Sequence, residues 1–389
     1  MKHQSCIPGC ITVLCMLLAI SQMACNEDME SRSLITKFRV LGVQTNPPEA
    51  VVGDSIEVRG IYAPVAGQSA NVAFVTVDTQ WIAALASFLP SNVDQLSEAE
   101  LQALFESVAS QNGLDPTAAA NLLMPEFKVI VVPVDATTGV ATLPAENIVI
   151  SAPLVAILKL LGQTSGLPLY MVACSNGTID EAAIQRSANN LTNSQEIGNL
   201  ESACIGNDAS AIASFKTIEI RVPDGTAKDA DPLNQNPRVR VFQIEKTTHP
   251  PDSPPGDTGT IICESTDGCR DAKEFRVAVD KADFQYFHGF SREENEMEKM
   301  FVSWFATGGE FGADRIRSED AQAAADAMSD HDKAKLDQIL ADDTRPHWFT
   351  VEWMPPVAGG DFDLWVVVND LRGGVGYARY HISVQAPNY

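Results

Sequence analysis

The chain has few basic residues and none of the short motifs that mark the common enzyme classes. Lys and Arg number 27 against 51 Asp and Glu, which gives a net charge of −24. So acidic a surface repels the phosphate backbone, which excludes nucleic acid as a partner, and it disfavours direct adhesion to anionic lipid. The sequence contains no HExxH, GxSxG, Walker A or GxGxxG pattern. We therefore expect a protein that is not an enzyme and that needs no cofactor, with Ca²⁺ as the alternative ligand of an acidic chain.

Extended apolar runs are also scarce, and the most prominent one lies in the first 25 residues. Lys2 precedes an apolar run over residues 11–20, and the small residue Ala24 stands before Cys25. The run is about half as long as a membrane-spanning helix, and this order of segments is typical of a secretory signal. It resembles a bacterial lipoprotein signal, in which Cys25 would be acylated, although Gln22 stands where such signals usually have Leu. The alternative is ordinary secretion with a free N-terminus.

The signal predicts where the protein resides. We expect residues 1–25 to be a lipoprotein signal peptide and the polar residues 26–33 to be a tether. An acylated N-terminus would anchor the exported chain to a membrane. We therefore expect a protein of the outer membrane or cell surface, with a periplasm-facing anchor as the alternative.

Four cysteines remain once the signal and the acylated residue are set aside. An even number of cysteines in an exported chain predicts disulfides. Four cysteines allow three pairings, and we favour the two that join neighbours within one proposed domain, Cys174–Cys204 and Cys263–Cys269. The alternative is a metal site, but the spacing does not match a zinc ribbon and no His neighbours the pairs.

Strand patterns dominate the rest of the chain and predict a mainly β fold. A strand over residues 37–43, a proline turn at 46–49 and a strand region over 51–58 with a Gly53-Asp54 turn are typical of the start of an immunoglobulin-like sandwich. A polar, turn-rich stretch over 224–237 predicts a solvated linker. We therefore expect two immunoglobulin-like β-sandwich domains with helical insertions, at 34–223 and 238–389.

Alternation near the C-terminus predicts a β-hairpin with one buried face. Leu364, Val366 and Val368 alternate, a turn follows at 369–374, and a second alternating strand returns to Val384. In this pattern we expect Trp304 and Trp353 to lie in a core, whereas Trp365 is a candidate for exposure.

Helical signals interrupt the strands. A capping box begins at Ser97 and a second one at Thr178. Residues 153–161 are apolar and predict a buried strand or helix, and the Ala-rich residues 318–340 predict an inserted, exposed helix in the second domain.

Four segments carry a resemblance to a known family. They are residues 38–43 (FRVLGV) running into 46–49 and 53–54, residues 302–309 (VSWFATGG), residues 353–356 (WMPP), and residues 364–377 (LWVVVNDLRGGVGY). In these segments the chain resembles poorly characterised secreted lipoproteins with immunoglobulin-like domains from myxobacteria and related Gram-negative groups. The resemblance implies the fold and the lipid anchor, and it carries over no catalytic residue.

The most unusual cluster of side chains is aromatic, and it consists of Phe284, Tyr286, Phe287, His288 and Phe290. Its functional interpretation is a stacking platform for sugar or peptide. The alternative, which we favour, is packing between a sandwich and a loop, because aromatic side chains are usually buried for their area.

Clusters of carboxylates are the remaining candidates. Asp224, Asp229 and Asp231 lie in the predicted linker and are weak candidates for Ca²⁺, although their spacing matches no EF-hand loop and a solvated linker is favoured. A run of Glu from 293 to 298 predicts a solvated face. Asp361, Asp363 and Asp370 form a conceivable acid/base set, but no His is expected to pair with them.

These observations predict a non-catalytic envelope lipoprotein that acts as a surface binding or scaffold module. Its partners would be the membrane, through the lipid anchor, and another envelope protein or a glycan. The alternatives are a secreted hydrolase, which needs two or more acidic side chains in one pocket, and a Ca²⁺-stiffened adhesion module.

Overall fold

The computed structural model describes most of the chain after the predicted signal and tether. The described residues are 33–64, 67–87, 89–90, 92–111, 126–160, 166–188, 200–222, 227–244, 247–249, 259–263, 269, 271–288, 295–313, 315–317, 347–370 and 372–385. The predicted signal peptide, Cys25 and nearly all of the tether lie outside them, as does the predicted helix over 318–340. No helix in the described part of the chain is long and apolar enough to cross a membrane.

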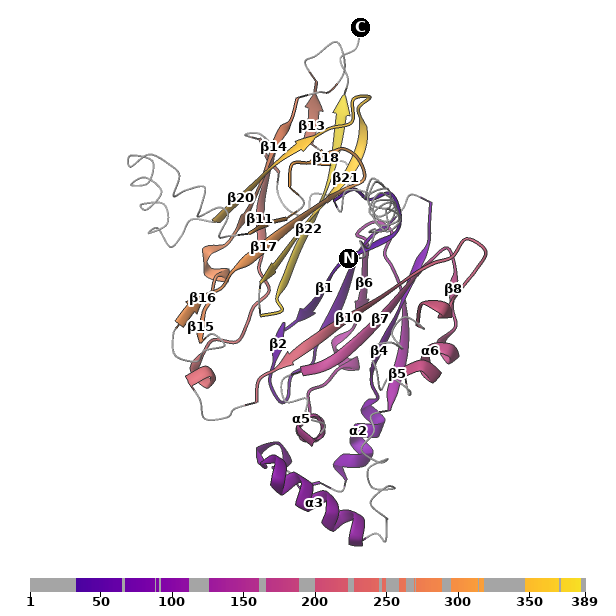
Figure 1. The fold of residues 1–389 in the computed structure, drawn as a ribbon, viewed down its shortest axis with the longest axis vertical. Coiled ribbons are helices and arrows are strands. Elements are labelled where there is room, and N and C mark those ends of the chain that lie inside the picture. The colour runs from indigo at the N-terminus through magenta and orange to yellow at the C-terminus, as the bar shows by residue number, and fades with distance from the viewer. Residues whose placement is uncertain are drawn as a thin grey trace, which may run out of the picture.

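The N-terminal half is a sandwich of two sheets (Figure 1). One sheet has the order β1-β3-β6, with bounds Arg39–Asn46, Glu57–Ala63 and Val140–Leu143. The other has the order β2-β10-β7-β4-β5, with bounds Glu49–Ala50, Ser210–Ile220, Gly166–Ser175, Ala70–Val77 and Phe127–Pro133. Within the predicted strand region over 51–58 the chain turns at residues 52–53, where Gly53 takes a positive φ of 103°, as the predicted Gly53-Asp54 turn requires. Only Glu57 and Val58 of this region belong to a strand, β3, and Ser55 makes an isolated bridge to Val149.

The C-terminal half is a second sandwich. Its first sheet has the order β12-β11-β14-β20-β18, with bounds Thr247–His249, Val239–Ile244, Lys273–Val279, His347–Met354 and Glu310–Phe311. Its second sheet has the order β13-β22-β21-β17-β19, with bounds Gly259–Ile262, Val375–Gln385, Gly360–Asp370, Met300–Ala306 and Arg315–Arg317. The predicted hairpin is β21 and β22, paired from Gly360↔Val384 to Asn369↔Val375.

Both sandwiches have the strand order of an immunoglobulin-like domain, so the predicted fold class is confirmed. In each half the first and second long strands pair with each other in one sheet. In the other sheet the third long strand pairs with the second-last long strand, which pairs with the last, and together these are the A-B-E and C-F-G arrangement. In each half a short strand runs parallel to the last strand, β2 beside β10 and β13 beside β22. Trp304 is fully buried on β17, the position of strand C, where immunoglobulin domains place a core Trp.

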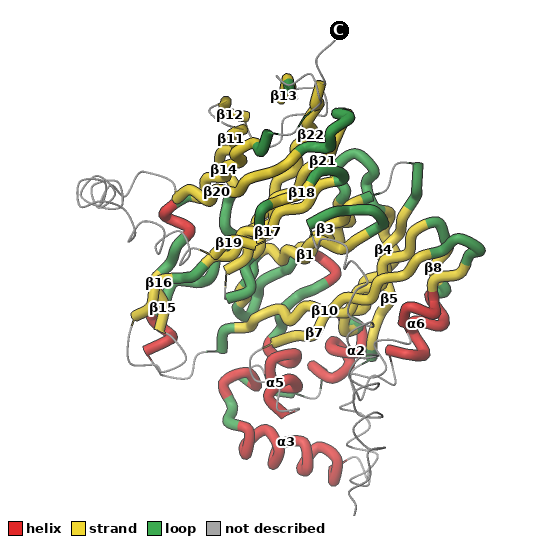
Figure 2. The backbone as a smooth tube through the Cα atoms, turned by 45° about the horizontal axis from the view of Figure 1, so that its top comes forward, coloured by secondary structure: helices red, strands yellow, loops and turns green. Residues whose placement is uncertain are grey.

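Helices are inserted into the N-terminal sandwich (Figure 2). Their bounds are α2 Thr79–Ala86, α3 Glu98–Gln111, α5 Ala152–Leu160 and α6 Glu181–Ala188. The short 3-10 helices are η1 Val93–Gln95, η2 Ala145–Asn147, η4 Glu201–Ala203, η5 Ala227–Ala230 and η6 Lys281–Asp283. Two small antiparallel two-stranded sheets pair β8 (Thr178–Ile179) with β9 (Cys204–Ile205) and β15 (Tyr286–His288) with β16 (Asn295–Met297).

The caps of these helices test the sequence signals. The capping box at Ser97 is confirmed, because the Ser97 N–H and hydroxyl donate to Glu100 and the Glu100 N–H donates back to Ser97 Oγ. The second predicted box is wrong. Thr178 lies in β8, and the cap of α6 is Asp180, whose Oδ1 accepts the N–H of Ala183 at 2.9 Å.

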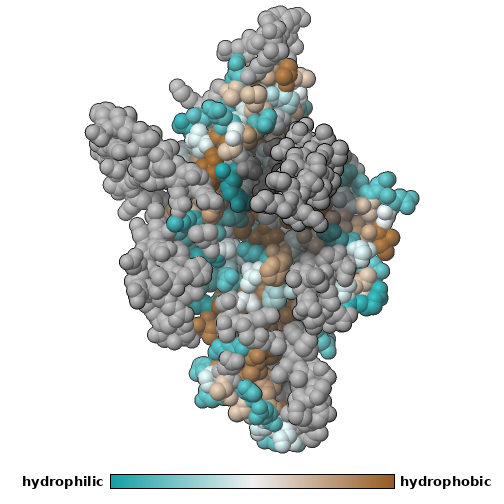
Figure 3. Space-filling model, in the orientation of Figure 1, coloured by the Kyte–Doolittle hydropathy of each residue, from teal (hydrophilic) through white to brown (hydrophobic). Residues whose placement is uncertain are grey.

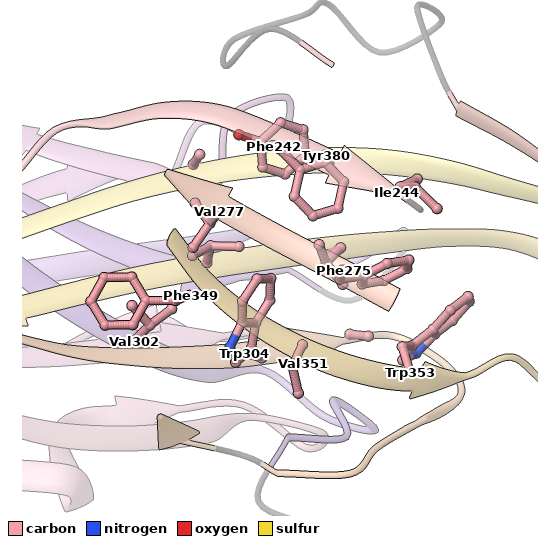
Figure 4. Close-up of a cluster of buried hydrophobic side chains, with 14 of the residues drawn as sticks. Phe242, Ile244, Phe275, Val277, Val302, Trp304, Phe349, Val351, Trp353 and Tyr380 are labelled. Atoms are coloured by element: carbon pink, nitrogen blue, oxygen red, sulfur yellow. The ribbon is translucent and has the colours of Figure 1, made fainter. Parts of the chain in front are cut away.

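Each sandwich has a hydrophobic core between its two sheets. The core of the C-terminal sandwich is aromatic: Phe242 stacks on Tyr380 at 4.1 Å between ring centroids, and Phe275 stacks on Trp353 at 5.1 Å (Figure 4). The core of the N-terminal sandwich contains Tyr62 and Phe74, both fully buried.

Besides the two cores, an apolar contact joins the two sandwiches to each other. Ile61 and Ala63, on the outer face of β3, pack against the outer face of β21 through Val367 and Trp365. Trp365 is fully buried, so its candidacy for exposure is wrong. The reason is that β21 is covered on both faces, and its continuous run Leu364–Val368 is the pattern of such a strand.

Candidate functional site

The densest polar constellation of the described residues lies where the two sandwiches meet. We call it the junction cluster, and its members are Glu49, Arg221, Asn234, Glu298, Asp370 and Arg372. Glu49 begins β2 and Arg221 follows β10, so both come from the N-terminal sandwich. Asp370 and Arg372 border the turn between β21 and β22, and Asn234 belongs to the segment that connects the halves.

Glu49 is the centre of the junction cluster. Arg221 donates to both of its carboxylate oxygens at 2.8 Å, and Arg372 donates to Oε2 at 2.8 Å from the other sandwich. The backbone N–H of Asn234 adds a fourth hydrogen bond at 2.8 Å. Burial alone would raise the pKa of Glu49, but the hydrogen bonds from Arg221 and Asn234 and the two guanidinium charges outweigh it and lower the pKa. Glu49 is therefore an ionised bridge between two arginines.

Glu298 and Asp370 have the opposite electrostatic character. The Glu298 side chain is 0% exposed and accepts a hydrogen bond from Arg372 at 3.1 Å. Burial, followed by the negative charge of Asp370, raises the pKa of Glu298 to about 7. Burial also raises the pKa of Asp370, whose Oδ1 accepts the N–H of Gly374 at 2.7 Å. The junction cluster thus contains one firmly ionised carboxylate and two that burial moves toward the neutral form.

The connecting segment is part of this joint. Asn234 is 2% exposed, so the prediction that this part of 224–237 is solvated is wrong. Its neighbour Asn236 donates to Thr45 O at 2.7 Å and accepts the N–H of Val375 at 2.9 Å, one contact with each sandwich. The side-chain amide of this residue thus forms hydrogen bonds with backbone N–H and C=O groups at the buried ends of strands.

The predicted disulfides are both present. Cys174 is bonded to Cys204 and Cys263 to Cys269, with Cα–Cα distances of 5.5 and 5.1 Å. The first joins the end of β7 to β9 and so ties down the insertion that contains α6. The metal alternative for these four cysteines is therefore wrong, because disulfide sulfurs have no thiolate to offer.

The aromatic cluster is described only in part. Phe284 is 8% exposed and lies 5.2 Å from His347 between ring centroids, which agrees with the packing interpretation for this residue. Tyr286, Phe287 and His288 form β15, but their side chains lie outside the described set, as does Phe290. A stacking platform for sugar or peptide therefore stays a prediction.

The predicted carboxylate sites do not converge. Asp224 lies outside the described residues, whereas Asp229 is exposed and Asp231 half-buried, each with interactions of its own. Within the described ranges no group of three His, Cys, Asp or Glu is arranged to hold a metal ion. The predicted Ca²⁺ site thus stays a prediction. Of the Glu run, Glu293 and Glu294 lie outside the described ranges, and Glu298 is buried rather than solvated.

Asp363, which we expected to have no His partner, lies within hydrogen-bonding distance of one. Asp363 Oδ1 lies 3.2 Å from His381 Nδ1, and Asp363 Oδ2 accepts from Arg379 at 2.9 Å. The expectation failed because Asp363 and His381 are directly opposite in the β21–β22 ladder, where side chains are close neighbours. The Asp363 N–H donates to Thr307 Oγ1, so the surroundings are those of a strand pair at the surface.

A groove of about 610 Å³ opens beside β5, away from the junction cluster. Phe127 and Val129 of β5 and Ala182 of α6 supply its apolar lining. Three carboxylates from different elements line it as well, Asp78, Glu126 and Glu181. Sequence patterns gave no hint of this groove, because its residues come from three segments that only the fold brings together.

Comparison with known proteins gives no family. No family model and no curated protein matches the chain. Among solved structures, it aligns with Escherichia coli alpha-2-macroglobulin activated by porcine elastase at 10% identity and a TM-score of 0.19, over 92% of this chain and 22% of that one. Dimeric latent PorU from Porphyromonas gingivalis aligns at 10% identity and a TM-score of 0.21, over 91% and 24%. Murine CEACAM1b aligns at 6% identity and a TM-score of 0.17, over 90% and 100%.

The chain thus spans about a quarter or less of the first two of these proteins. All three TM-scores are too low for the likeness to carry an argument. The immunoglobulin-like assignment rests on the strand order of the two sandwiches.

Proposed function

We propose that this protein is a non-catalytic envelope lipoprotein, a rigid module that presents a binding surface outside the cytoplasm. The observation that carries the proposal is the locked pair of sandwiches. Trp365 is fully buried between them, and Arg372 bridges Glu49 of one half to Glu298 of the other. Buried apolar contact and buried ion pairs hold domains in one orientation better than a small polar interface does. Such a body suits a scaffold or a receptor.

Two further features support a position in the envelope. Two disulfides fit an oxidising compartment, where such bonds persist. Ser33, the last residue of the predicted tether, and Ile35 pair with Ala306 of β17 through hydrogen bonds of 2.9 and 2.8 Å. A lipid on Cys25 would therefore attach to the body through the C-terminal sandwich, within reach of an eight-residue tether.

Labelling with radioactive palmitate tests the anchor. We expect label on the wild-type protein and none on Cys25→Ser, because acylation needs the thiol that follows the signal. Fractionation of the same cells should place the wild type with the outer membrane and the variant in the soluble exported fraction. Absence of label on the wild type, or equal label on both, would end the lipoprotein proposal.

The groove beside β5 supports a second candidate function, that of a secreted hydrolase. It brings Asp78, Glu126 and Glu181 into one pocket, as that hypothesis requires. However, Glu126 and Glu181 are exposed, whereas an acid catalyst is usually kept neutral by burial. Assay of the purified protein against a panel of glycosides and peptides decides between them: turnover that Glu126→Gln and Glu181→Gln abolish would favour the hydrolase, and no turnover favours binding.

A further inference from the structure

The groove beside β5 lies at an edge of a sheet. β5 is the last strand in the order β2-β10-β7-β4-β5, so in the described part of the chain it pairs with β4 alone. A strand at an edge presents backbone N–H and C=O groups on its outer side, where another extended segment can pair. In Figure 1, β5 runs along the margin of the N-terminal sandwich next to α6.

The register shows which groups of β5 point outward. The N–H of Asp78 donates to Glu126 O and the N–H of Val134 donates to Ala70 O, one bond at each end of the β4–β5 ladder. In an antiparallel pair the bonded residues alternate, so the even-numbered residues of β5 bond to β4. The backbone groups of the odd-numbered residues, Phe127, Val129 and Val131, therefore face away from β4.

The groove opens on these outward groups. Gln185, which lines the groove from α6, already donates its side-chain amide to the outward carbonyl of Phe127. The next outward residue, Val129, lines the groove too. Pro133, which has the same parity, shows that this edge tolerates a residue without an N–H.

The net negative charge of the groove lining favours a positively charged partner. Its lining carries three carboxylates, Asp78, Glu126 and Glu181, against the single ammonium of Lys128. The whole chain is acidic as well, with a net charge of −24. Complementary charge speeds encounter and suppresses partners of the wrong sign. An acidic rim beside apolar Phe127, Val129 and Ala182 therefore suits a segment in which cationic and apolar residues alternate.

We propose that the β5 edge and its groove bind an extended peptide segment of a partner protein, rich in Lys or Arg, which adds to the sheet as a further strand. This inference rests on the proposed binding function and names the partner's chemistry. Main-chain hydrogen bonds to Val129 and Val131 would supply affinity, and the acidic rim would supply specificity. At about 3.3 Å per residue, a segment of six to eight residues matches the length of β5.

Titration with a fluorescent synthetic octapeptide of alternating Lys and Val tests the proposal on the full-length protein. We expect saturable binding to the wild type that weakens as salt rises from about 0.05 to 0.5 M, because exposed charge pairs are screened. The matched octapeptide of Glu and Val should not bind. An N-methylated version of the Lys peptide, which cannot pair along one edge, should bind at least tenfold more weakly.

Two variants locate the binding. Glu126→Lys should weaken it at least threefold, because the reversed charge repels the Lys side chains of the peptide. Glu146→Lys changes the net charge equally from an exposed site outside the groove and is the control. Val129→Pro removes the outward N–H and spares the β4 ladder, so the melting temperature should change little while binding falls at least fivefold.

The proposal is overturned if the Lys peptide does not bind, if the N-methylated peptide binds equally well, or if Glu146→Lys weakens binding as much as Glu126→Lys. It is equally overturned if Val129→Pro melts like the wild type and still binds fully. These results would leave the proposed anchor and the proposed lack of catalysis untouched, because the palmitate, fractionation and turnover assays test those two parts separately.

Discussion

Glu298 is the residue whose replacement most directly tests the electrostatics of the junction cluster. Its pKa is raised from 4.5 to about 7 by burial and by the charge of Asp370. A carboxyl whose pKa is higher in the folded state holds a proton that unfolding releases. The stability from this proton is complete below the unfolded pKa and is lost as pH rises through the folded one.

The size of the effect follows from the two pKa values. One unit of pKa corresponds to about 1.4 kcal/mol. Since only the part of the shift that falls between about pH 5 and pH 8 counts, Glu298 should lower the free energy of unfolding by roughly 2 kcal/mol over that range. The raised pKa of Asp370 acts in the same direction, whereas the lowered pKa of Glu49 acts in the opposite one, its stability being lost as pH falls.

The variant Glu298→Gln isolates the contribution of Glu298. Gln cannot ionise, so the difference in unfolding free energy between wild type and variant should shift by roughly 2 kcal/mol over this range, in favour of the variant at high pH. Urea unfolding can be followed by fluorescence, because four of the five tryptophans lie in the C-terminal sandwich. Glu274→Gln replaces a 43% exposed carboxylate in the same sandwich and is the control. Parallel curves for Glu298→Gln and wild type from pH 5 to pH 8 would refute the reasoning.

Two further predictions concern packing and covalent links. Trp365→Ala should lower the free energy of unfolding by about 3 to 5 kcal/mol, because it empties a fully buried site between the sandwiches; a loss below about 1 kcal/mol in urea unfolding would show that this contact does not hold the halves together. Paired replacement of Cys174 and Cys204 by Ala opens a link between residues 30 apart and should cost about 2 to 4 kcal/mol; a melting temperature equal to that of the wild type, and no further change on adding reductant, would contradict it.

Local patterns in the sequence were enough to predict the elements of each sandwich. The alternation from Leu364 to Val384 predicted the hairpin, and proximity along the chain predicted both disulfides. These features depend on residues close in sequence, where period and spacing carry the information. The outline of two β-sandwiches followed from adding such local signals together.

The contact between the sandwiches was not predictable in this way. Arg372 and Glu49 are 323 residues apart, and nothing in the residues around either one specifies the other. Asn234 was expected to be solvated because its neighbours form turns, yet the fold buries it between two arginine-bearing strand ends. One usable signal was overlooked: the unbroken apolar run around Trp365 is typical of a strand covered on both faces.

The repeated strand order has a consequence for where the two halves differ. Each half places a short strand parallel to its last strand and shares the same central strands in both sheets, although the first sheet of the C-terminal sandwich has a further strand at each edge. The differences therefore lie at the edges and in the connections: helices lie between β4 and β5 and between β7 and β10 in the first half, and a long stretch joins β19 to β20 in the second. The central strands are a common frame, and what distinguishes the halves is built around that frame.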